Sequence, residues 1–267
     1  RVLFRSQMAI KGPYRQAKSF SEATGECEVP LAAVKTRKGF GYITLEGKWH
    51  IKPKYHEAER FAEGYALVER KERLRYINCR NEELQVPHTF EIGSDFVEGL
   101  ALIQASTSDG YFYGYVNHQG KYAIEPRFAD AYTFREDRAI VMSSEGKYGF
   151  VDRTGQYILP MVYSSAWYFN SGRAFVMKED GYWYLIDESG ELYNQVEYLQ
   201  AMPFDNGLAP VHIPRFGWSF IRTDGTVLTG TVAYDDVSPF EHGYAPVLLG
   251  DNWGLINRKG EQVLDCR

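Results

Sequence analysis

The sequence predicts an all-β repeat protein, either a closed β-propeller of about seven small blades or an open β-solenoid of stacked three-stranded units. Three observations lead to this class. A phrase of about 35 residues recurs along the 267-residue chain, and each copy carries the turn chemistry of a β-hairpin. No copy is large enough to bury both faces of its own sheet, so the copies are expected to pack on one another.

The repeat is clearest in a four-letter pattern, x-Ala-x-Val/Ile, which occurs seven times from LAAV at residue 31 to YAPV at residue 244. The spacings between successive alanines are 34, 35, 38, 35, 35 and 36 residues. We therefore expect one repeat domain over residues 1–267, with a partial unit at 1–30 and units that start near 31, 65, 100, 138, 173, 208 and 244. The alanines are Ala32, Ala66, Ala101, Ala139, Ala174, Ala209 and Ala245.

Each unit begins with this Ala-x-Val strand, whose alternation places Ala and Val or Ile on one face. Its outward position is often apolar as well, as at Leu67 and Ile140, so the strand is predicted to be buried on both sides. A hairpin follows. In GFVDRTGQYIL, residues Asp152 to Gly155 have the Asp-first, Gly-last signature of a type I turn with a glycine bulge.

An aromatic residue and a glycine mark the same two points of nearly every hairpin. The aromatic is replaced by Leu74 in the second unit, and the closing glycine by Asn81, which also tolerates a left-handed backbone. After the hairpin, a proline followed by an aromatic, as at Pro53 and Tyr55, predicts a short fourth extended piece. The unit closes on a phenylalanine with Gly or Asp three residues later.

Two observations favour the propeller over the solenoid. Pro210 and Pro246 lie inside Ala-x-Val strands, and because proline cannot donate to a ladder, we expect that strand at a sheet edge, as in the innermost strand of a blade. The chain also begins late in a unit and ends early in one, so its two ends could complete a single blade.

The composition excludes several classes of function. Thirty basic and 35 acidic residues give a net charge of -5 with the signs mixed, which argues against a nucleic-acid partner. No apolar stretch approaches the roughly 20 residues of a membrane span. The three cysteines and six histidines form no metal-ligand spacing, and no phosphate-binding loop or nucleophile elbow occurs, so we expect no metal, cofactor or catalytic residue.

The unit F-x-E-G-x-A-x-V, G-x-W-G-x-I-D-x-x-G, I-x-P-x-Y resembles the bacterial WG repeat family, also called KWG repeats, from about Pro13 to Leu264. The Trp-Gly pair itself is present only at Trp253 and Gly254. The resemblance implies a bacterial protein, located in the cell envelope or secreted, that serves interaction rather than catalysis. It supplies no catalytic residue.

Function is expected where the repeat departs from itself. The third unit carries three additional residues, the fifth is rich in aromatics, and the second has lost its aromatic and both glycines. We predict a non-enzymatic module that holds another protein, with carbohydrate binding and glycan hydrolysis as alternatives. The candidate binding residues are Arg75, Tyr111, Phe112, Tyr113, Trp183, Tyr184 and Trp218.

Overall fold

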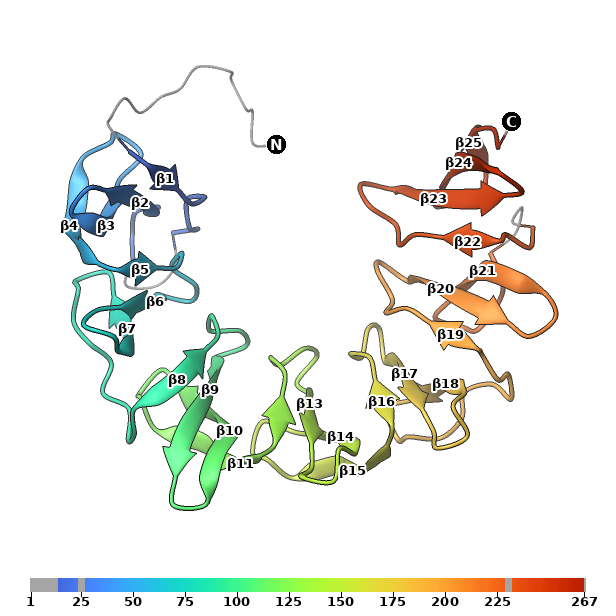
Figure 1. Cartoon of the computed structure of the whole chain (residues 1–267), viewed down its shortest axis with the longest axis horizontal. Helices are drawn as coiled ribbons and strands as arrows, with labels where there is room; N and C mark the ends of the chain where they lie inside the picture. Colours follow the sequence, from blue (N-terminus) through green and yellow to red (C-terminus); the bar gives the residue numbers. More distant parts are fainter. Residues whose placement is uncertain (1–13, 24–26, 229–231, 267) are drawn as a thin grey trace. The chain divides into compact units, whose positions relative to one another are not determined.

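The computed structural model describes residues 14–23, 27–228 and 232–266. Every regular element in this part of the chain is a β-strand, and the strands form small antiparallel sheets one after another (Figure 1). The predicted all-β repeat class is therefore confirmed. The chain divides into two compact units, one up to Thr133 and one from Phe134 onward.

The first unit contains three sheets, with strand orders β1-β2-β3-β4, β5-β6-β7 and β11-β10-β9-β8. Its strands are β1 (Gln16–Ala17), β2 (Ala32–Thr36), β3 (Gly39–Ile43), β4 (Trp49–Tyr55), β5 (Glu57–Ala58), β6 (Tyr65–Glu69), β7 (Leu74–Asn78), β8 (Phe90–Gly93), β9 (Leu100–Thr107), β10 (Gly110–Asn117), β11 (Tyr122–Phe128) and β12 (Asp130–Ala131).

The second unit repeats the same plan, with β13-β14-β15 followed by β16-β17-β18, β19-β20-β21 and β22-β23-β24-β25. Its strands are β13 (Ala139–Met142), β14 (Tyr148–Val151), β15 (Tyr157–Tyr163), β16 (Ser165–Ala166), β17 (Arg173–Met177), β18 (Trp183–Asp187), β19 (Gln200–Ala201), β20 (Leu208–Ile213), β21 (Gly217–Arg222), β22 (Asp236–Val237), β23 (Tyr244–Leu249), β24 (Asn252–Asn257) and β25 (Gln262–Leu264).

The predicted turns form for the expected reasons. In the hairpin that leads into β15, the Asp152 carboxylate accepts hydrogen bonds from the backbone N–H of Thr154 at 2.8 Å and of Gln156 at 3.0 Å. Gly155 has a φ of 83°, a conformation that glycine adopts without strain. The closing phenylalanine–glycine landmark is a second turn. Glu63 and Gly64 both have positive φ, as a two-residue type I′ turn requires.

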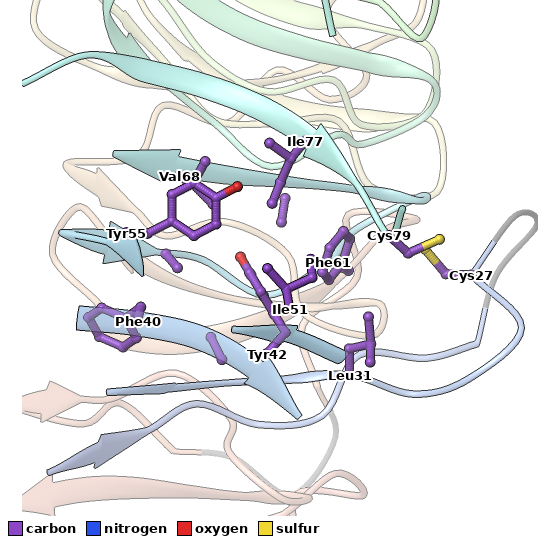
Figure 2. Close-up of a cluster of buried hydrophobic side chains, with 13 residues drawn as sticks. Cys27, Leu31, Phe40, Tyr42, Ile51, Tyr55, Phe61, Val68, Ile77 and Cys79 are labelled. Carbon is purple, nitrogen blue, oxygen red and sulfur yellow. The ribbon is translucent and has the colours of Figure 1, made fainter. Parts of the chain in front are cut away.

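The core of each unit lies between successive sheets. Figure 2 shows one such cluster, in which Phe40 and Tyr42 of β3 and Ile51 of β4 face residues of β6 and β7. Tyr42 contacts Phe61 with ring centroids 4.7 Å apart, and its hydroxyl donates to the Glu59 carbonyl at 2.7 Å. Burial raises the pKa of Tyr42 above its usual value, so this buried phenol stays neutral.

The Ala-x-Val strand is buried on both faces, as predicted: Ala66, Leu67 and Val68 are all nearly inaccessible to solvent. Its predicted place at a sheet edge is wrong, because β20 lies between β19 and β21, and β23 between β22 and β24. Proline is tolerated there because the inner strand is only two residues long. Pro210 uses only its carbonyl on that side, as the acceptor for the N–H of Met202 at 2.9 Å. The choice between a closed ring and an open solenoid stays a prediction.

Candidate functional site

The glycine after the hairpin aromatic marks where the outer strand of a sheet crosses over the hairpin. A Cβ built on Gly41 would lie 2.5 Å from the Ile51 carbonyl oxygen, and one on Gly114 would lie 2.6 Å from that of Ile124. Gly149 and Gly254 are crowded in the same way by the backbones of β15 and the segment after β24. These glycines precede β4, β11, β15 and β25, the four outer strands of the described chain. The glycine is thus required by the fourth strand.

Three repeats carry a side chain at this position, namely Arg75, Tyr184 and Ser219, and their sheets end at the third strand. Two of the three keep a remnant of the outer pairing. The Trp183 N–H donates to the Tyr198 carbonyl at 2.8 Å and the Tyr198 N–H donates back at 2.9 Å. Trp218 and Tyr234 exchange the same two bonds. The outer segment therefore still lies along the hairpin in these two repeats.

The second repeat has lost this pairing altogether among the residues that the structure describes. Leu74 takes the place of Trp183, and Phe90 is the aromatic that would pair with it. Phe90 instead begins β8 and pairs with Ala105 of β9, in the next sheet. Because of the three additional residues in the third repeat, β9 and β10 are eight residues long and Ala105 lies within the ladder. The substitutions in the second repeat and the additional residues in the third repeat therefore act together, because the longer hairpin of the third repeat pairs with the segment that the second repeat does not hold.

A groove of about 660 Å³ lies where the outer strand is missing. It is bounded on one side by the start of β7 and on the other by the segment that leads to β8. The segment that leads to β8 packs against Gly120. Gly120 lies so close to the Gln85 backbone that no Cβ would fit there. The lining residues are Glu69, Glu72, Arg73, Leu74, Arg75, Glu83, Leu84, Gln85, Val86, Pro87, His88, Thr89, Phe90 and Glu91.

Arg75 is the predicted site residue that this groove contains. Its Nη1 donates to Glu83 Oε2 at 2.9 Å and its Nη2 to the Arg70 carbonyl at 3.3 Å. The Nε atom is buried and donates to no atom of the described chain. Four glutamates line the groove against two arginines and one histidine, so the groove carries a net negative charge when the histidine is neutral.

The other predicted residues lie elsewhere. Tyr111, Phe112 and Tyr113 are on β10, where Tyr111 is 58% exposed, and none of the three lines the groove. Trp183 and Trp218 belong to the second unit and hold its architecture: Trp183 stacks on Trp167 with centroids 5.8 Å apart, and Trp218 is buried. The structure thus gathers only Arg75 into the groove. The glutamates and Phe90 were missed because their repeat positions alone gave no signal.

Tyr184 is buried, and its hydroxyl contacts two carboxylates, Asp180 at 2.8 Å and Glu197 at 3.3 Å. Hydrogen bonds from the Tyr182 backbone and the Tyr184 hydroxyl lower the pKa of Asp180. A glycosidase needs a general acid whose pKa is raised, so Asp180 does not suit that role.

Within residues 14–23, 27–228 and 232–266, no group of three or more His, Cys, Asp or Glu residues could hold a metal ion. Over the same residues there is no helix of the length and apolarity needed to cross a membrane.

Comparison with solved structures finds likenesses of low identity. The computationally designed Ika8 protein is 12% identical, with a TM-score of 0.47 over 96% of this chain and 88% of its own. BamB from Moraxella catarrhalis is 8% identical, with a TM-score of 0.44 over 94% and 87%. Hsv2p from Kluyveromyces lactis is 9% identical, with a TM-score of 0.46 over 91% and 92%. The comparison with curated proteins gave no match.

A family model described as "WG containing repeat" matches residues 40–72, 113–148, 148–183, 218–253 and 253–267, more than half of the chain. The two internal stretches that it leaves unmatched are 73–112 and 184–217. Nearly all of the groove falls in the first of them, outside the matched repeats. By the extent of the match, the chain belongs to the WG-containing repeat family.

Proposed function

We propose that this chain is a non-enzymatic interaction module that holds another protein in the groove beside β7. The observation that supports this role is the loss, at Leu74, of the outer pairing that the hairpins before and after it keep at Phe40 and Tyr113. A repeat scaffold can tolerate such a local departure because neighbouring repeats support it, and functional sites are grafted on scaffolds of this kind. A location in a bacterial cell envelope, or outside the cell, is what the repeat family leads us to expect.

The walls of the groove suit a protein ligand. Its volume of about 660 Å³ lies within the range of roughly 300–1,000 Å³ for small-molecule pockets, so the groove can admit a short segment of a partner. Arg75 is held in place by Glu83 and the Arg70 carbonyl, so its guanidinium is already ordered before a partner arrives. A preordered side chain loses little conformational entropy on binding. Arginine is one of the residue types that are enriched among the hot spots of protein interfaces.

Photo-crosslinking tests the proposal. A benzoylphenylalanine placed at Thr89, on the groove wall, should form an adduct with one defined protein in native cells. Lys54 provides the matched control, since it precedes Tyr55 of β4 just as Thr89 precedes Phe90. The partner is then purified and titrated against the chain by calorimetry.

We expect an adduct from position 89 and none from position 54. Thr89→Trp, whose ring would occupy part of the groove, should bind the purified partner at least tenfold more weakly, whereas Lys54→Trp at the matched control position should keep full affinity. Equal adducts from both positions, or full affinity in Thr89→Trp, would contradict the proposal.

A further inference from the structure

The start of β7 presents backbone groups of the kind that an added strand binds. Glu69 pairs with Leu74 as Met177 pairs with Trp183, so Leu74 stands at the same point of the ladder as Trp183. At Trp183 both backbone groups bond outward, to Tyr198. By the same register, the N–H and C=O of Leu74 point away from β6. Within the described residues no strand lies against them.

The next residues show where the native pairing stops. Tyr76, two residues further along β7, still accepts a hydrogen bond from the Leu84 N–H at 2.9 Å. Beyond Leu84 the chain leaves the hairpin, and Phe90 returns in the ladder of β9. The open stretch of edge is therefore short, and the groove covers it. Because an isolated edge of this kind offers two ladder bonds, charge must supply much of the selectivity.

The charge of the groove favours a basic ligand. Arg75 is neutralised by Glu83 at 2.9 Å. The remaining charged residues of the lining are three glutamates, Glu69, Glu72 and Glu91, and one arginine, Arg73. His56 lies 3.1 Å from Glu69 and is mostly exposed, so it offsets that carboxylate only when protonated. Lysine or arginine side chains on a bound segment would complement this excess of carboxylate.

We propose that the groove binds an extended basic peptide of its partner as an added β-strand, through antiparallel backbone hydrogen bonds to Leu74. This inference rests on the interaction role proposed above and specifies its chemistry. The added strand takes the position that β4, β11 and β15 occupy in intact repeats.

The chain itself supplies the probe. Residues 49–56, WHIKPKYH, contain β4, in which Tyr55 pairs with Phe40, the residue that corresponds to Leu74. The segment also carries Lys52 and Lys54. A fluorescein-labelled synthetic copy, titrated with the full chain and followed by fluorescence anisotropy, should therefore bind the groove. A copy with both lysines changed to glutamate should bind at least tenfold more weakly.

N-methylation of the peptide distinguishes strand addition from other modes. In an antiparallel pair, alternate N–H groups face the neighbouring strand. Methylation at the tyrosine, whose N–H faces the hairpin in β4, should weaken binding at least tenfold. Methylation at the preceding residue, Lys54 of the copied segment, should change affinity less than threefold. These changes leave the protein untouched, so misfolding cannot mimic the result.

Protein variants locate the site. Glu72→Lys and Glu91→Lys should each weaken the probe severalfold, whereas Glu145→Lys, in the second unit and outside the groove, should not. If both N-methylations weaken probe binding alike, strand addition is overturned. The proposed function would still stand in that case, provided that Thr89 forms a crosslink with the partner. Absence of probe binding, or binding that ignores the two groove substitutions, would also overturn this inference. Failure of the crosslink at Thr89 would instead overturn the proposed function.

Discussion

Gly149 provides a direct test of the claim that the outer strand, and not backbone conformation, requires glycine in the hairpin. An added Cβ would lie 2.8 Å from three backbone atoms of β15, the Leu159 oxygen, the Met161 nitrogen and the Pro160 carbon. Its φ is not in the left-handed region. Gly149→Ala therefore adds a steric clash without backbone strain.

Overpacking a well-packed site costs about 1–3 kcal/mol, and a clash with three backbone atoms belongs at the upper end of that range. Gly181 is the matched control in the same unit, because it has a φ of 83° and no atom within 4 Å of its added Cβ. Gly181→Ala should cost only the left-handed strain of about 1 kcal/mol. An argument from φ alone would predict the opposite order.

Urea unfolding followed by tryptophan fluorescence measures the difference, since four of the five tryptophans lie in the second unit. With a slope of roughly 2 kcal/mol per molar urea, the Gly149→Ala midpoint should fall by about 1.5 M, and that of Gly181→Ala by about 0.5 M. A Gly149→Ala variant as stable as Gly181→Ala would refute the role of the outer strand.

Three further predictions concern the turns, the contacts between repeats and closure. Hydrogen bonds from the hydroxyls and backbones of Ser189 and Thr226 lower the pKa values of Asp187 and Asp224, so both carboxylates stabilise the fold above the unfolded pKa of about 3.9 and lose that effect as the pH falls through their folded values. Asp187→Asn combined with Asp224→Asn should flatten the loss of stability below about pH 4 in a urea and pH series; an unchanged profile would count against these turns. The Glu136 carboxylate accepts the N–H of Ser171 at 2.6 Å, so Glu136→Ala should accelerate amide exchange there roughly tenfold by NMR, and unchanged exchange would show that this link is not formed in solution. In small-angle scattering, a closed ring of 267 residues should have a radius of gyration of about 18 Å, and a clearly larger value would exclude the propeller.

Much of the fold could be predicted because its determinants are local. The left-handed glycines and the capped aspartates act within a few residues of the chain, as Asp152 does for Thr154 and Gln156. Alternation in the Ala-x-Val strand likewise needs no partner to be recognised. The prediction failed at Pro210, since the tolerance of proline depends on how long the neighbouring strand is, and that neighbour comes from the preceding repeat.

The candidate site was predicted only at Arg75. Its signal was a side chain in place of a repeated glycine, a departure that the fifth repeat shares at Tyr184. The outer segments of the fifth and sixth repeats still pair at Trp183 and Trp218, whereas no strand pairs with the outer side of Leu74 in the described chain. The additional residues near Tyr111 predicted a binding role for the third repeat itself. In the structure they lengthen β9 and β10, and the longer hairpin pairs with Phe90 of the second repeat.

The sequence by itself determined that this protein is a series of β-hairpin units, where each unit turns, and which units lack the glycine that an outer strand needs. Those features follow from steric limits on single residues. Only the tertiary structure decided where Phe90 pairs, because Leu74 and Ala105 belong to different sheets and compete for one segment. The longer β9–β10 hairpin takes that segment, and the groove beside β7 is the result.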